Sequence, residues 1–233
     1  MNIKNKISLK NISLQYNELL VLDNINFSLP WEKITCILGP SGCGKTSLLN
    51  IIAGLNRSYT GEMTSLNEPI SYIFQEDRLL EWETVYSNIS LVKDVEDREK
   101  ICTILKTLDL YEFKDKYPKE LSGGMRQRVS LGRGFYYTSN LLLLDEPLKS
   151  LDYDLKLNLI NYIIENFNNT HCTMLYVTHD IEEALTLGDK IIILSKRPTT
   201  ILKEFEINIP KDTRDIYTEE LISIRKKIIN LIT

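Results

Sequence analysis

Hydrophobic and polar residues alternate along residues 7–29, and this period of two is typical of strands that bury one face. The apolar positions are Ile7, Leu9, Ile12, Leu14, Val21, Ile25, Phe27 and Leu29. The pattern predicts two antiparallel strands that form a small sheet near the start of the chain.

Short β-rich or apolar runs occur at residues 33–38, 141–144, 173–177 and 190–194. The second and third are apolar enough for strands covered on both faces, as in a parallel sheet. The first run breaks at Gly39 and is followed by a helical pattern over 46–53. The sequence therefore predicts an α/β fold in which further strands follow the N-terminal sheet.

Residues 83–120 contain charged helical stretches and no strand pattern, and we interpret them as an inserted helical subdomain. Helices are also expected from Leu121 through Arg133 and over 219–232, where acidic residues come first and lysines late. We expect one domain over residues 1–233. Its expected parts are a core at 1–78 and 122–200, the helical subdomain at 79–121, and a C-terminal hairpin and helix at 201–233.

Composition and charge exclude several classes of protein. The 233 residues include 28 lysines and arginines against 32 acidic residues, so the formal net charge is -4 and a nucleic-acid partner is disfavoured. We expect neither a signal peptide nor a transmembrane helix, which needs about 20 consecutive apolar residues. The four cysteines lack the spacing of a zinc site and are expected to be reduced thiols in the cytosol.

Residues 39–46 read GPSGCGKT and fit the pattern G-x-x-x-x-G-K-S/T between a predicted strand and a predicted helix. Glycines let successive backbone N–H groups turn around phosphate oxygens, and the helix N-terminus adds partial positive charge. In this pattern Lys45 reaches the terminal phosphates and Thr46 holds Mg²⁺. The candidate nucleotide-binding residues are Gly39, Pro40, Ser41, Gly42, Cys43, Gly44, Lys45, Thr46 and Ser47.

A second candidate element follows the apolar run at 141–144, which leads into Asp145, Glu146 and Pro147. Parallel strands deliver their last residues to the crevice in which ligands bind. Asp145 can therefore hold Mg²⁺, and Glu146 can polarise the water that attacks the phosphate. Read alone, the segment is better explained as a strand followed by a polar turn. Beside the phosphate loop, a catalytic element is the better explanation.

Residues 121–128, LSGGMRQR, place a serine and two glycines at the start of a helix. Ser122, Gly123 and Gly124 form a candidate second phosphate-binding site, although an ordinary capped helix explains the same pattern. The segment lies between the phosphate loop and LLLLDEP, and in this order the chain resembles the ABC-type ATPases. The resemblance implies a P-loop NTPase core with a mixed sheet, an N-terminal antiparallel β subdomain and an inserted helical subdomain.

The resemblance also implies roles for further positions. Gln75 matches the glutamine that senses Mg²⁺ and the attacking water, and His179 matches the histidine that contacts the γ-phosphate. Tyr16 matches the aromatic residue that stacks on adenine, and Asp152 the aspartate that faces a partner subunit. The candidate catalytic residues are then Lys45, Gln75, Glu146 and His179, and the candidate Mg²⁺ ligands are Thr46, Gln75 and Asp145.

Two segments narrow the resemblance. Residues 75–85, QEDRLLEWETV, are similar to a segment in ATPases from importers of the nitrate, sulfonate and taurine type, and residues 194–198, LSKRP, are similar to a turn in the same group. In such proteins the first segment helps to receive a helix of the membrane subunit. Glu81 replaces the usual proline, which is expected to loosen it. The candidate permease contacts are Arg78, Leu80 and Trp82.

The resemblance implies an ATP-hydrolysing subunit that powers solute uptake through a separate permease. Two copies would meet head to tail with two ATP molecules and Mg²⁺ between them, so that residues 122–124 of one copy face Lys45 of the other. The expected partners are a second copy, the integral membrane permease and, indirectly, an external solute-binding protein. The expected location is peripheral, at the cytoplasmic face of the cell membrane.

Several alternatives stay open at this point. Nitrate, sulfonate, taurine and thiamine-precursor systems are all consistent with the sequence. A soluble ABC ATPase of a cofactor-assembly or other non-transport machine is the alternative to an importer. A P-loop kinase acting on a small molecule is a further alternative, but it does not explain the LSGG segment at 121–124.

Overall fold

The computed structural model describes residues 7–64, 69–137, 139–149 and 151–232; the remaining residues of the expected domain lie outside the described ones. An antiparallel three-stranded sheet has the order β2-β1-β4. Its strands are β1 (Ile7–Tyr16), β2 (Leu19–Leu29) and β4 (Tyr59–Met63). The eight apolar residues of the alternating pattern are all buried, which confirms the predicted N-terminal sheet.

The main sheet has the order β5-β6-β7-β3-β8-β9. Its strands are β3 (Ile34–Leu38), β5 (Ile70–Ile73), β6 (Leu141–Asp145), β7 (Thr173–Thr178), β8 (Lys190–Leu194) and β9 (Ile201–Glu206). Neighbouring strands are parallel except for the antiparallel pair β8 and β9, so the sheet is mixed, as expected. Every residue of β3, β6, β7 and β8 is buried, because a hydrophobic cluster covers each face.

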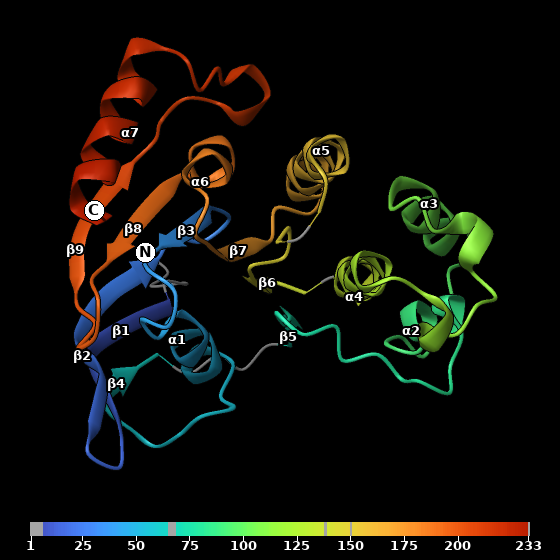
Figure 1. Cartoon of the computed structure of the whole chain (residues 1–233), viewed down its shortest axis with the longest axis horizontal. Coiled ribbons are helices and arrows are strands. Elements are labelled where there is room, and N and C mark those ends of the chain that lie inside the picture. Colours follow the sequence, from blue (N-terminus) through green and yellow to red (C-terminus); the bar gives the residue numbers. More distant parts are fainter. Residues whose placement is uncertain (1–6, 65–68, 138, 150, 233) are drawn as a thin grey trace, which may run out of the picture.

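Helices cover this sheet and extend beyond one end of it (Figure 1). They are α1 (Lys45–Ile52), α2 (Val85–Ser90), α3 (Arg98–Thr107), α4 (Gly123–Tyr137), α5 (Tyr153–Thr170), α6 (Ile181–Leu187) and α7 (Glu219–Ile232). Helix α1 and the three-stranded sheet pack on one face, and α5, α6 and α7 pack on the other. Helices α2 and α3 lie farther out, with α4 between them and the main sheet (Figure 1).

Some elements are not predicted by the sequence patterns. Strand β4 exposes most of its residues, and α5 buries only one side, so neither gives a continuous apolar run. The helix expected through Arg133 continues to Tyr137 as α4. Gly134 lets this helix pack closely against β5. A Cβ at this position would lie 2.4 Å from Ile73 Cγ1, so a larger residue would push α4 away from the strand.

Candidate functional site

The phosphate loop connects β3 to α1. It leaves the carboxyl end of a fully buried strand at residue 39 and enters the helix at Lys45. Gly44 precedes the helix with φ 113°, a conformation that glycine adopts without steric cost. Lys45 Nζ donates hydrogen bonds to the carbonyl oxygens of Gly39 (2.8 Å) and Pro40 (3.0 Å), which curl the loop around the lysine.

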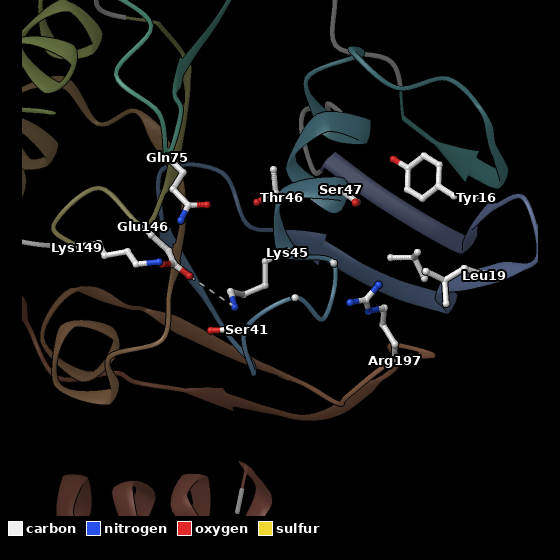
Figure 2. Close-up of a pocket in the computed structure, with 13 residues that line it drawn as sticks. Tyr16, Leu19, Ser41, Lys45, Thr46, Ser47, Gln75, Glu146, Lys149 and Arg197 are labelled. Atoms are coloured by element: carbon white, nitrogen blue, oxygen red, sulfur yellow. Dashed lines mark ion pairs between the residues drawn. The ribbon is translucent and has the colours of Figure 1, made fainter. Parts of the chain in front are cut away.

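A cavity of about 320 Å³ opens beside this loop (Figure 2). The sequence-predicted residues that line it are Tyr16, Ser41, Gly42, Gly44, Lys45, Thr46, Ser47, Gln75 and Glu146. Leu19, Val21, Lys149 and Arg197 also line it, and the sequence did not mark them as site residues. One end is therefore aromatic and apolar and the other is charged, an arrangement that suits a nucleotide base and its phosphates.

Thr46 and Asp145 meet at the carboxyl end of β6. Thr46 Oγ1 donates to Asp145 Oδ2 at 2.6 Å, and Asp145 is 2% exposed. Burial raises the pKa of Asp145 and outweighs the opposing hydrogen bond from Thr46, while the neighbouring Glu146 carboxylate raises it further. Hydroxyl and carboxylate oxygens are ligands that Mg²⁺ prefers, and it keeps several waters, so one carboxylate fits it. Among the described residues, no cluster of three or more His, Cys, Asp or Glu side chains is placed to hold a metal.

Glu146 has a left-handed backbone with φ 48° and is 8% exposed. Its carboxylate lies 3.8 Å from Lys45 Nζ, 2.9 Å from Lys149 Nζ and 3.5 Å from His179 Nδ1. Burial opposes ionisation, but the contacts with Lys149, Lys45 and His179 outweigh it and hold the pKa of Glu146 below its ordinary value. Glu146 is therefore an ionised group at the cavity wall that can accept a proton from water.

Replacing Lys149 with methionine is expected to move the acid limb of the turnover–pH profile to higher pH. The ion pair with Lys149 lowers the pKa of Glu146, so its loss raises that pKa. A raised pKa leaves the base protonated, and unable to accept a proton, over more of the acidic range. ATP turnover at saturating ATP measures this, with Lys203→Met on the exposed side of β9 as the control. An acid limb that stays in place would show that Lys149 does not tune Glu146.

Several sequence-predicted residues act from outside the cavity wall. Gly39 and Pro40 contribute the carbonyls that hold Lys45. Cys43 is buried, and its carbonyl accepts a hydrogen bond from Thr199 Oγ1. The His179 side chain is 54% exposed and stands beside Glu146 rather than in the wall, so its predicted contact with the γ-phosphate stays a prediction.

The start of α4 does not line the cavity of its own chain. Ser122 Oγ accepts a hydrogen bond from Met125 N at 3.3 Å, as an ordinary helix cap does. Asp152 likewise caps α5 by accepting from Leu155 N at 3.0 Å. Residues 122–124 therefore lie outside the nucleotide cavity of their own chain, and their binding to a phosphate stays a prediction.

Arg126 fixes the segment at 75–85 against α4. It donates to both carboxylate oxygens of Asp77, at 2.8 and 3.2 Å, and to Glu81 Oε1 at 2.7 Å. The Glu81 carboxylate thus adds a contact between the segment and α4, and the expected loosening of the backbone stays a prediction. Trp82, next to this anchor, is 73% exposed and free to meet a partner.

Comparisons with known proteins indicate the family of this chain. The sequence model of the ABC transporter family matches residues 22–149, which include the phosphate loop, Asp145 at the end of β6 and Glu146 after it. An aliphatic sulfonates import ATP-binding protein of Bacillus cereus is 40% identical over 230 residues, covering 94% of this chain and 91% of that protein. One from Pseudomonas syringae is 39% identical over 198 residues, covering 84% of this chain and 85% of that protein.

A solved structure shares the fold. The ABC transporter cassette MJ0796, described as dimeric, superposes with a TM-score of 0.78 at 27% identity and covers 87% of this chain and 99% of its own. Another structure of that cassette is described as a post-hydrolysis state bound to ADP and Pi. No helix in the described part of the chain has the length and apolar character needed to cross a membrane. On these grounds the chain belongs to the ABC transporter family, as an ATP-binding and ATP-hydrolysing subunit of an ABC importer.

Proposed function

We propose that two copies of this chain hydrolyse ATP with Mg²⁺ at their interface to drive the uptake of aliphatic sulfonates through a separate membrane permease. The observation that carries the ATPase part is the convergence of Lys45, Thr46 and Glu146 on one cavity beside the phosphate loop (Figure 2). The names of the relatives support the sulfonate part. They do not favour a soluble machine for cofactor assembly.

The loop and its surroundings bind the nucleotide in this proposal. Backbone N–H groups of the loop and the Lys45 ammonium donate to the terminal phosphates, and the half-exposed ring of Tyr16 offers a stacking surface to adenine. Thr46 and Asp145, already joined at 2.6 Å, would hold Mg²⁺ together with Gln75. When bound, the metal neutralises charge on the β- and γ-phosphates.

Glu146 is the proposed general base. Its ionised carboxylate accepts a proton from the attacking water, and Lys149 and His179 hold that carboxylate in place. Glu146 has a left-handed backbone, and its side chain lies near Lys45. The proposed base and the lysine that binds phosphate therefore face the same cavity. The arrangement supports in-line attack on a phosphate held by the loop.

A second copy completes each site in this proposal. Residues 122–124 expose backbone N–H groups at the start of α4 but do not line the cavity of their own chain. Facing the cavity of a partner, they add donors to the terminal phosphate and make ATP part of the interface. The dimeric description of the similar cassette supports this arrangement.

Trp82→Ala is expected to reduce co-purification with the permease by about tenfold or more, because exposed aromatic anchors carry much of the binding energy of interfaces. Trp82 is 73% exposed and follows Glu81, which Arg126 contacts, and it does not line the nucleotide cavity. ATP affinity of the isolated chain is therefore expected to be unchanged. Tyr217→Ala, 67% exposed near α7, is the matched control. Equal recovery of permease with both variants would remove Trp82 from the docking surface.

The transport proposal is tested in steps. Tagged chain is first purified from solubilised membranes of its native cells, and a multi-spanning permease is expected to accompany it. Chain and permease are then reconstituted in vesicles, with ATP on the side that carries this chain and with the companion external binding protein and the solute on the opposite side. ATP-dependent uptake of a labelled alkanesulfonate is expected to exceed that of nitrate. Uptake of nitrate alone would overturn the solute, and recovery of a soluble assembly in place of a permease would overturn the transport role.

A further inference from the structure

The turn between β8 and β9 is tied to both the phosphate loop and β2. Thr199 N donates to Val21 O at 2.9 Å, and Thr199 O accepts from Asp23 N at 2.9 Å. Thr199 Oγ1, which is buried, donates to the carbonyl oxygen of Cys43 in the phosphate loop. The turn is closed by Ser195 N, which donates to Thr200 O at 3.0 Å. A side chain carried on this turn therefore keeps a defined position relative to the loop.

Arg197 is the residue of this turn that reaches the nucleotide cavity. It is among the lining residues, and its guanidinium points toward the phosphate loop between Leu19 and the loop backbone (Figure 2). Arg197 Nη2 lies 3.2 Å from the position that a Cβ on Gly42 would take. The guanidinium is therefore in contact range of whatever the loop encloses.

The described side chains around the cavity offer Arg197 no acidic partner. The other two lining cations are committed to Glu146, Lys45 at 3.8 Å and Lys149 at 2.9 Å. In the part of the chain that the structure describes, no carboxylate forms an ion pair with Arg197. A planar guanidinium of this kind suits the oxygens of a phosphate, to which it can donate two parallel hydrogen bonds.

The position along the cavity indicates which phosphate. Gln75, Glu146 and Lys149 stand at one end, where the terminal phosphate is attacked in the proposed function (Figure 2). Arg197 stands at the other end, between the loop and the side chains of Leu19 and Tyr16 that suit the base. The intervening part of a nucleotide is the ribose and the phosphate attached to it.

We infer that Arg197 is a further nucleotide-binding residue, whose guanidinium donates to the phosphate next to the ribose. The inference rests on the proposed binding of ATP in this cavity. ATP and ADP share that phosphate, so both are held equally by this contact. GTP also shares it, so the contact does not select the base. Chemistry at the terminal phosphate does not involve Arg197.

Calorimetric titration of the full chain with ATP, ADP and GTP tests this inference. Arg197→Ala is expected to raise the Kd of all three by about tenfold, the scale of one charge-assisted contact. Arg197→Lys is expected to recover part of the affinity. Lys196→Ala is the matched control. Lys196 is the exposed neighbour of Arg197 in sequence, and it lines a separate groove with Leu194 and Leu231.

The outcomes separate this inference from the proposed function. Wild type and Lys196→Ala that bind ATP, together with Arg197→Ala that binds equally well, would overturn the inference and leave nucleotide binding intact. A loss of affinity for ATP but not for ADP would place the contact at the terminal phosphate. A loss of affinity for nucleotides of one base only would place the contact on the base. Either result would overturn the inference. Wild type that binds no nucleotide would overturn the proposed function itself. Melting of each variant without nucleotide is expected to match wild type, since the Arg197 side chain is exposed.

Discussion

Glu146→Gln is expected to lower ATP turnover by about 10²–10⁴-fold while leaving ATP binding in place. The amide has nearly the shape of the carboxylate but cannot accept a proton from water. Glu146 is 8% exposed and lies 3.8 Å from Lys45. Among the described residues, no other carboxylate lines the cavity, so none can replace Glu146 as the base. Phosphate release at saturating ATP measures the effect.

The same variant is expected to accumulate as an ATP-bound dimer. ATP that is not hydrolysed continues to join residues 122–124 of one copy to the phosphate loop of the other, and ligand binding stabilises the state it binds. Light scattering with and without ATP measures the change in mass. Glu165→Gln, on the exposed side of α5, is the control for a neutralised acid. Turnover at the wild-type rate in Glu146→Gln would remove the role proposed for this residue.

Lys45→Ala is expected to weaken ATP binding by about 10²-fold, because charge-assisted hydrogen bonds to phosphate contribute about 1.5–3 kcal/mol each. The substitution also removes the donor from the carbonyls of Gly39 and Pro40, which loosens the curl of the loop. Lys45→Arg is expected to restore little, because the wider guanidinium does not fit a space shaped for an ammonium that is 5% exposed. Calorimetric titration with ATP gives the Kd of each variant.

A matched control tests whether the loss of affinity is specific to Lys45. Lys203→Ala removes an exposed cation from β9 that does not line the nucleotide cavity, and the variant is expected to bind ATP as wild type does. Comparison of melting temperatures separates loss of a ligand contact from loss of the fold. An affinity for ATP within about twofold of wild type in a folded Lys45→Ala would show that the phosphates are held elsewhere.

Most of the elements that the sequence predicts correctly are recognised from patterns within short, continuous stretches of the chain. The strand, glycine loop and helix at 34–52 lie in one continuous stretch, so their pattern predicts both the elements and the chemistry between them. Helix α7 and strand β8 have the bounds that charge and apolar pattern indicate. Strand β4 was missed because most of its side chains are exposed, and α5 because it has a polar surface and a single apolar stripe.

The contacts between distant segments could not be read from such signals. Lys149 forms an ion pair with Glu146, whose backbone is left-handed, and Arg126 joins Glu81 across 45 residues of sequence. Arg197 enters the site because β8 pairs beside β3, which places the turn after β8 next to the loop after β3. Partners of these kinds depend on which strands are neighbours and on how each turn directs its side chains.

The sequence by itself determined the class of chemistry in this protein, because the residues that bind phosphate and metal follow one another in short motifs whose local conformation they impose. Only the tertiary structure decided how these motifs act together. The sheet order β5-β6-β7-β3-β8-β9 brings Asp145 within hydrogen-bonding distance of Thr46, surrounds Glu146 with cations and adds Arg197 to the cavity wall. Strand order is set by burial of apolar faces over the whole chain, and no short motif encodes it.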